Sequence, residues 1–169
     1  MLAELDLQVA ALDAAVAEAA ANDRRARLLM TQPGVGPITA LAFAVTIGDV
    51  RRFATSGQVA SYVGLIPREH SSGGKQRLGA ISKQGNRFVR LLLVEAVQTT
   101  CRFDEGFRRQ YAVRCHHKPK GVAKVAAARK LAVRLYWMLK TNTSYPEIAQ
   151  VESSSRVALA GPMHTDDLD

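Results

Sequence analysis

The sequence has few cysteines, no long apolar run and no basic N-terminus, and each shortage excludes a class of protein. Its two cysteines, Cys101 and Cys115, stand 14 positions apart without a CxxC pair, so they predict packed or surface thiols and not a zinc site. No apolar run approaches the ~20 residues that a membrane-spanning helix needs. The first residues include acids, whereas a signal peptide begins with basic residues. We therefore predict a cytoplasmic protein that makes no membrane contact and holds no metal ion in this chain.

Acidic residues are also scarce across the middle of the chain, where basic residues are dense. Residues 51–140 contain 19 Lys and Arg against four Asp and Glu, a local net charge of +15, while residues 1–22 contain four acids and no base. The whole chain carries a formal charge of +8. Charge of this density exceeds what a solvated surface needs and predicts a polyanionic partner, with nucleic acid favoured over a membrane surface.

The basic region includes a pair of serines followed by a pair of glycines. Ser71 and Ser72 precede Gly73 and Gly74, and the basic residues around them are Arg68, Lys75, Arg77, Lys83, Arg87 and Arg90. Adjacent glycines allow a backbone to approach a ligand closely, and guanidinium and ammonium groups neutralise phosphate oxygens. A hydroxyl among such groups is a candidate nucleophile for phosphoryl transfer. The alternative is a solvated polar loop followed by a basic helix start.

The first 20 residues repeat apolar side chains at alternating steps of three and four. The positions are Leu2, Leu5, Val9, Leu12, Val16 and Ala19, which form the a/d seam of a heptad repeat. Because the pattern lasts fewer than three heptads, the seam alone makes a marginal coiled coil. The predicted helix either joins copies of the chain or packs on the chain's own core.

A short helix over residues 23–32, a glycine-rich turn over 33–37 and a helix over 38–47 follow. This order resembles the helix-hairpin-helix motif, in which the turn amides and the start of the second helix bind a phosphate without reading bases. Gly34, Val35 and Gly36 are the residues that would make this contact. A tight turn between two helices that serves packing alone is the alternative.

The remaining patterns complete a mainly α-helical fold. We predict a helix that ends at Tyr62 and is capped by Thr55 or Ser56, a short hairpin within residues 65–81, and helices over 88–100, 103–115 and 122–140. The domain prediction is a coiled-coil or oligomerisation helix (1–22), a compact helical domain (23–148) and a disordered tail (149–169).

The three later helices are expected to differ in which of their sides are buried. The helix over 88–100 is apolar on more than one side and is expected to be the buried spine. The next helix places Phe103, Phe107 and Tyr111 at spacing four on one core-facing side. The last helix is amphipathic, with Arg134 among its polar residues.

The order GLIPR, SSGGK, RLG, ISKQGN and VRLLLVEA within residues 64–96 is similar to the C-terminal domain of the Piv/MooV-related DEDD insertion-sequence transposases. These are described as bridge-RNA-guided serine recombinases, and the resemblance runs from about residue 28 to residue 148. It implies that Ser71 or Ser72 attacks the DNA backbone, with Ser72 favoured because it abuts the glycines. It also implies a prokaryotic protein that acts on chromosomal DNA. The implied partners are DNA, a structured guide RNA, and a homo-oligomer (dimer or tetramer) or a complete transposase.

In that family an N-terminal RuvC-like domain binds Mg²⁺ through four acidic residues, and no such domain precedes the heptad segment here. We therefore expect a truncated or separately encoded C-terminal piece with no cofactor of its own. The chain shows no Ser/His/Asp spacing that would activate a serine, and His70 beside the serines is typical of a surface or hydrogen-bonding residue.

The residue patterns and the family resemblance together leave two functions open. The first is DNA transposition, in which the serine cleaves and rejoins DNA strands through a phosphoserine once a RuvC-like partner completes the site. The second is a non-catalytic nucleic-acid-binding module of the helix-hairpin-helix type, or a transposase remnant.

Overall fold

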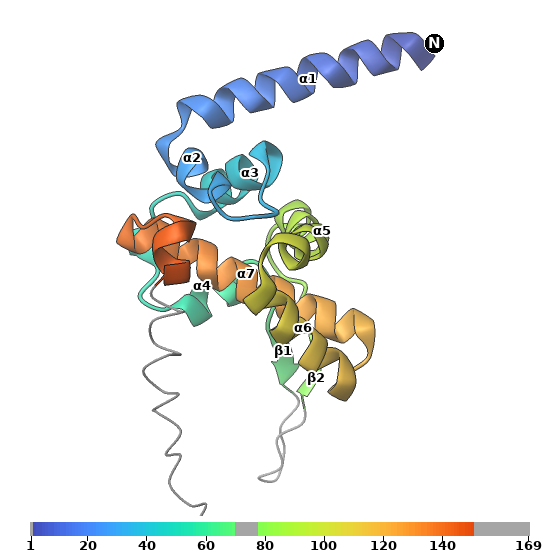
Figure 1. Ribbon diagram of the computed structural model, residues 1–169, viewed down its shortest axis with the longest axis vertical. Coiled ribbons are helices and arrows are strands. Elements are labelled where there is room, and N and C mark those ends of the chain that lie inside the picture. Colours follow the sequence, from blue (N-terminus) through green and yellow to red (C-terminus); the bar gives the residue numbers. More distant parts are fainter. Residues whose placement is uncertain (1, 70–77, 151–169) are drawn as a thin grey trace, which may run out of the picture.

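The computed structural model describes residues 2–69 and 78–150, and it confirms a mainly α-helical fold (Figure 1). The elements in chain order are α1 (Leu2–Asn22), α2 (Arg24–Met30), α3 (Pro37–Ile47), the 3-10 helix η1 (Val50–Arg52), α4 (Ser56–Tyr62), β1 (Pro67–Glu69), β2 (Leu78–Ile81), α5 (Arg87–Phe103), α6 (Glu105–His117) and α7 (Lys120–Thr141). A further helical turn covers residues 145–150, and the rest of the predicted tail lies outside the described residues. Within the described ranges, no helix combines the length and the apolar character that crossing a bilayer requires.

Helix α7 is the centre of the domain. It contacts α2, α4, α5, α6 and η1, and Figure 1 shows it running through the middle of the molecule. Its core-facing side combines four alanines with the large buried residues Leu131, Leu135, Tyr136 and Met138. Small residues let neighbouring helices approach closely, while the large ones fill the space between them. The helix therefore supplies a continuous buried surface for most of the other elements.

Helix α5 differs from the buried spine that its composition predicts. It buries Val89, Leu93 and Val97, but Phe88 and Leu91 are more than half exposed. The residues that face the core recur at helical spacing on one side, so α5 is amphipathic and not buried all round. That expectation is wrong, because α7 holds the central position.

The boundary between α5 and α6 corrects the predicted aromatic stripe. Asp104 ends α5 and caps α6, where its side chain accepts the Phe107 N–H at 2.8 Å. Phe103 is consequently the last residue of α5 and is 71% exposed, whereas Phe107 is buried and Tyr111 packs against the core. The cap divides the aromatic residues between two helices, and only two of the three reach the core.

Asp104 also forms a buried ion pair with Arg134 of α7, at 2.6 Å. Both side chains are under 10% exposed. The Arg134 Nη1 group donates to Gln32 at 3.4 Å, and the guanidinium lies 5.6 Å from the ring centres of Phe107 and Tyr145. Burial acts to raise the pKa of Asp104, but the Phe107 N–H, Arg134 and the Tyr145 hydroxyl outweigh it and hold that pKa below its usual range. The pair joins the α5–α6 junction to α7 and to the end of the α2 segment.

Helix α1 contacts α2 and α3, and Ala20 is its buried residue. Figure 1 shows the N-terminal part of α1 extending away from the other helices. Four residues of the predicted heptad seam, Leu2, Leu5, Val9 and Leu12, are between 52% and 78% exposed. Within the described residues, these four side chains do not pack on the core of the domain.

We predict that Asp104→Asn lowers the free energy of unfolding by about 3 kcal/mol, because it leaves the Arg134 guanidinium buried without its counter-charge. The asparagine retains an oxygen that caps α6, which separates the loss of charge from the loss of the cap. Urea denaturation followed by circular dichroism measures the difference. The matched control is Glu105→Gln, which removes the next carboxylate along, from an exposed pair with Arg109, and should leave stability nearly unchanged.

The same pair predicts a pH dependence. Because the folded-state pKa of Asp104 lies below its unfolded value, its stabilisation is complete at neutral pH and is lost as the pH falls through the folded-state pKa. The stability difference between wild type and Asp104→Asn should therefore shrink on acidification. A difference that stays constant into strong acid would contradict this assignment.

Candidate nucleic-acid interface

The serine segment is attached to a two-stranded hairpin at one end of the molecule. Strands β1 and β2 are antiparallel, with Pro67 opposite Ile81 and Glu69 opposite Leu78, as the predicted hairpin within residues 65–81 requires. The predicted site residues Ser71, Ser72, Gly73, Gly74, Lys75 and Arg77 fall between the strands, outside the described residues. What the structure describes is the frame that leads into and out of this segment (Figure 1).

The base of the hairpin depends on two glycines that lie against neighbouring backbone. Gly64 and Gly85 both have positive φ, +71° and +82°. A Cβ on Gly64 would lie 1.9 Å from the Gln84 carbonyl oxygen, and one on Gly85 would lie 1.9 Å from that of Tyr62. Neither contact is possible for a side chain, so both positions require glycine. The two turns, around 64 and around 85, are consequently in direct backbone contact.

Two of the predicted nucleic-acid-binding arginines hold this base together. The Arg90 Nη1 group donates to the Val63 carbonyl at 3.0 Å and to the Gln84 carbonyl at 3.1 Å, so one guanidinium joins both turns. Arg68 on β1 donates to the Ser82 carbonyl at 3.2 Å. Part of the hydrogen-bonding capacity of each arginine therefore serves the hairpin, which makes Arg90 in particular a positioning residue.

An open groove lies between the hairpin and the start of α5. It has a volume of about 540 Å³ and is lined by Lys83, Arg87, Arg90, Ile81, Leu91 and Val94; we call it the α5 groove. Lys83 and Arg87 are exposed, and neither has an ion-pair partner within the described part of the chain. Three predicted cations thus meet in one groove.

The start of α5 adds a favourable dipole to the α5 groove. Asn86 caps the helix, accepting the N–H groups of Phe88 and Val89, and its amide donates to Thr46 of α3 at 3.1 Å. The N-terminal end of a helix carries partial positive charge, which favours an anion nearby. Helix dipole and side-chain cations therefore act in the same direction here.

In the turn between α2 and α3, two of the three residues predicted to contact a phosphate instead make contacts within the chain. Gly34 has φ +88°, and a Cβ there would lie 2.5 Å from Thr100 of α5, whose hydroxyl donates to the Pro33 carbonyl at 2.9 Å. The Val35 side chain is buried, and the backbone N–H of Val35 donates to the Gln32 carbonyl at 3.1 Å. Gly36 is exposed at the start of α3, where no described side chain caps the helix. Of the three predicted residues, which all line one open pocket, Gly36 is the most exposed.

The structure does not bring this turn and the hairpin together. The turn packs at Thr100, near the end of α5, whereas the α5 groove lies at Arg87, where the helix begins. Thirteen residues separate the two positions, or about 20 Å along the helix axis. The two predicted contact regions are therefore distinct.

Sequence reasoning missed two cations on the other side of the hairpin. Lys118, in the turn between α6 and α7, and Arg129 of α7 line a second cavity that also includes Ile81. The turn over residues 116–121 is basic in sequence, but only the fold shows that it meets the hairpin. Among the described residues, no group of three or more His, Cys, Asp and Glu is arranged to hold a metal ion. Burial raises the pKa of the Cys101 thiol, an environment typical of a packed cysteine.

Comparisons with known proteins find similar sequences over most of the chain. The transposase IS116/IS110/IS902 family matches residues 26–112. A Pseudomonas aeruginosa protein named "Probable family 20 transposase" is 36% identical over 148 residues, covering 85% of this chain and 44% of the relative. The transposase for insertion sequence element IS1328 of Yersinia enterocolitica is 35% identical, covering 72% of this chain and 37% of the relative. The pilin gene-inverting protein of Moraxella bovis is 32% identical, covering 73% and 39%. The chain spans less than half the length of these relatives.

We expect Lys83→Gln and Arg87→Gln each to weaken binding to a short DNA duplex and to reduce the slope of log affinity against log salt by about one. Each change removes one exposed charge from the α5 groove. Fluorescence anisotropy across a salt series measures both quantities.

Arg90→Lys should instead lower the free energy of unfolding by about 1 kcal/mol, because an ammonium does not reproduce the guanidinium that bridges two carbonyls.

The matched control is Arg109→Gln, which removes the same charge from an exposed position on α6, away from both candidate contact regions. It should leave the salt slope unchanged. Equal losses at Arg109 and Arg87 would show that net charge, and not the α5 groove, determines the affinity.

Proposed function

Because the chain belongs to the IS116/IS110/IS902 family of transposases, we propose that it is the part of an insertion-sequence transposase that binds DNA and supplies the serine nucleophile. The family match runs from α2 into α6, so it includes the hairpin, the serine segment and the α5 groove. The relatives' names support a role in transposition. DNA is the proposed substrate, and a structured guide RNA is a further proposed partner of the basic surface.

The observation that carries the proposal is that the base of the hairpin, whose strands flank the serine pair in sequence, lines the α5 groove. Ser71 and Ser72 belong to the segment joining β1 to β2, and Ile81 at the end of β2 lines the groove together with Lys83 and Arg87. A phosphodiester bound by those cations would lie next to the hairpin that bears the serines. Positive groups beside a reacting phosphate stabilise the charge that develops in the transition state.

The proposed reaction is a transesterification. The serine Oγ bonds to phosphorus and loses its proton, the phosphorus–oxygen bond to one deoxyribose breaks, and the departing oxygen takes up a proton. The reverse exchange with a second strand end rejoins the DNA and frees the serine. Among the described residues, no group of carboxylates fits the Mg²⁺ that the family resemblance implies.

A second candidate function, binding of nucleic acid without catalysis, is favoured by the start of α3. Gly36 is exposed there, and the helix begins without a side-chain cap among the described residues. Free amides at the start of a helix bind a phosphate without reading bases. This function accounts for affinity but assigns no chemistry to Ser71 and Ser72.

Covalent trapping distinguishes the two functions. The chain is incubated with phosphorothiolate-containing DNA from an insertion-sequence end, with and without a complete family member, and adducts that survive SDS are counted. We expect an adduct that disappears in the Ser71→Ala/Ser72→Ala double variant, with the two single variants identifying the nucleophile. Binding affinity should stay unchanged, since neither hydroxyl carries charge.

The matched control is Ser82→Ala, at the base of the same hairpin. The Ser82 hydroxyl is buried and has no hydrogen-bond partner among the described residues, so its removal should preserve both fold and adduct. An adduct that persists without Ser71 and Ser72 would overturn the nucleophile assignment. Binding without any adduct, in either mixture, would favour the non-catalytic function.

We also propose that α1 joins copies of the chain through its exposed seam. Leu2, Leu5, Val9 and Leu12 have the spacing of a coiled-coil interface, and the other described helices leave them uncovered. Burying each leucine against a partner contributes about 1.5 kcal/mol or more. A seam of this kind gains its stability from association, because most helical stability in proteins comes from packing an apolar face against a partner.

Leu5→Glu should shift the protein toward the monomer, because it places a charge within the seam. Light scattering coupled to size-exclusion chromatography measures the mass over a concentration series. Leu7→Glu is the matched control, since Leu7 is also exposed on α1 but lies off the heptad positions. Equal loss of association in both variants would contradict a coiled-coil interface and indicate a general effect on α1.

A further inference from the structure

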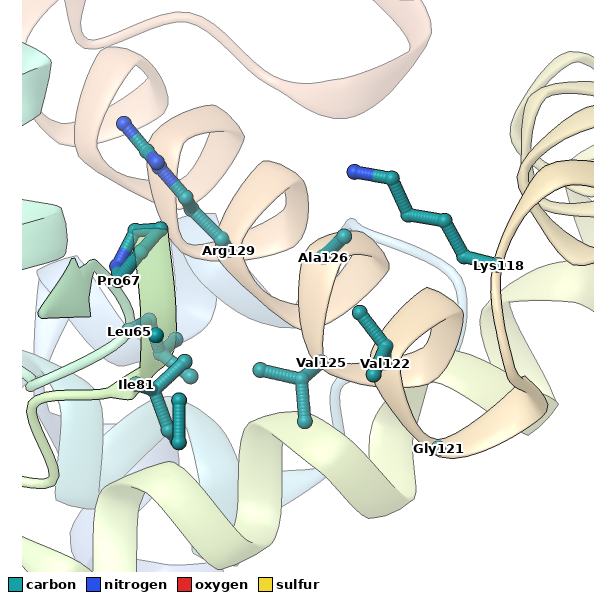
Figure 2. A pocket seen from close by; sticks show the side chains of 11 residues that line it. Leu65, Pro67, Ile81, Lys118, Gly121, Val122, Val125, Ala126 and Arg129 are labelled. Carbon is teal, nitrogen blue, oxygen red and sulfur yellow. The ribbon is translucent and has the colours of Figure 1, made fainter. Parts of the chain in front are cut away.

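A cavity of about 360 Å³ lies between the hairpin and the first turns of α7 (Figure 2). Its walls are aliphatic: Leu65, Pro67 and Ile81 come from the hairpin side, and Val122 and Val125 from α7. Figure 2 shows these side chains on the two sides of the cavity, with Lys118 and Arg129 at its edge. The proposed function assigns no role to this cavity.

Two cations stand at the edge of this otherwise apolar space. Lys118 and Arg129 both line the cavity, and neither has an ion-pair partner within residues 2–69 and 78–150. An apolar cavity with two uncompensated positive charges at its mouth suits a ligand that is flat and weakly polar at one end and anionic at the other. An apolar protein side chain would fill the cavity but leave both charges without a partner.

Small residues keep the cavity open. Gly79, Ala80, Gly121 and Ala126 contribute no more than a methyl group each, and a Cβ at Gly121 would meet no atom within 4 Å. The volume falls within the range of pockets that bind small molecules and exceeds what a single water requires. There is room for one aromatic ring between the aliphatic walls.

The cavity is next to the α5 groove. Ile81 lines both spaces, so strand β2 forms the wall between them. A DNA strand whose phosphates contact Lys83 and Arg87 would pass beside the opening of the cavity. Only strand β2, about 5 Å wide, would separate that DNA strand from the cavity. A base turned out of the strand could therefore reach the apolar space.

We propose that this cavity receives one unpaired nucleobase of the DNA strand bound in the α5 groove, while Lys118 and Arg129 neutralise its flanking phosphates. Unstacking a base costs a few kcal/mol, and an apolar pocket offsets part of that cost by covering the ring. The aliphatic walls form no hydrogen bonds with base edges, so occupancy should depend little on base identity. The proposal rests on the proposed DNA-binding function and adds the conformation of the bound strand.

The test uses a DNA duplex with 2-aminopurine opposite a mismatch next to a nick, in low salt and without any cleavage reaction. The fluorescence of 2-aminopurine rises when the base leaves the stack, so it reports base extrusion independently of catalysis. We expect wild type to raise the fluorescence on binding. Ala126→Leu should abolish the rise by filling the cavity, while affinity for unmodified duplex changes by less than about twofold, because no cationic group is lost.

Gly121→Leu is a second filling variant, placed on the first turn of α7 where space is open. Ala112→Leu is the matched control, because Ala112 is exposed on α6 and does not line the cavity. It should preserve the fluorescence rise. Lys118→Gln and Arg129→Gln should each reduce the rise and weaken binding of the mismatched duplex more than that of the paired duplex.

The outcomes separate this inference from the proposed function. DNA binding with normal salt dependence but no fluorescence rise, or a rise that survives both filling variants, would overturn the nucleobase site and leave DNA binding intact. Absence of DNA binding by wild type at low salt would overturn both. A filling variant that retains the rise but changes the oligomeric state would assign the cavity to a protein contact instead.

Discussion

The buried pair between Asp104 and Arg134 connects the parts of the fold that most depend on one another. Removing two charges from water is expensive, and the cost is recovered only when geometry and hydrogen bonding are both favourable. Here the carboxylate also accepts the Phe107 N–H that starts α6, and the guanidinium reaches Gln32 beyond α2. The pair therefore sets where α5 ends, where α6 begins and how both lie against α7.

The hairpin depends on a different constraint, which is close contact between backbone segments. Gly64 and Gly85 allow two turns to touch, and Arg90 then donates to a carbonyl from each side of that contact. Hydrogen bonds from a charged donor are stronger than neutral ones, so one arginine restrains both turns. The base is thus formed by the chain itself before any ligand binds. A frame of this kind suits the proposed reaction, because preorganised groups need not rearrange as charge develops.

Local signals predicted the helices well, because caps and hydrophobic spacing are properties of neighbouring residues. Thr55 caps α4 as expected, and the strands fall within the predicted hairpin. The errors concern relations between distant segments. Periodicity places Arg134 among polar residues but does not reveal that Asp104, thirty positions away, lies opposite it. In the candidate site, Lys83, Arg87 and Arg90 were identifiable as neighbours in sequence, whereas Lys118 and Arg129 meet the hairpin only through the packing of α7.

The separation of the two candidate contact regions bears on how the bound DNA would be held. The start of α3 and the α5 groove lie at opposite ends of α5, about 20 Å apart along its axis. Phosphates on one DNA strand are about 3.4 Å apart along the duplex axis, so this distance corresponds to roughly six steps. One duplex segment is long enough to contact both regions. The contacts proposed at both regions are to phosphates, through helix amides and cations, and such contacts position DNA without reading its sequence. On the proposed function, this part of the chain would orient the strand for the serine, and a separate partner, such as the proposed guide RNA, would choose the target.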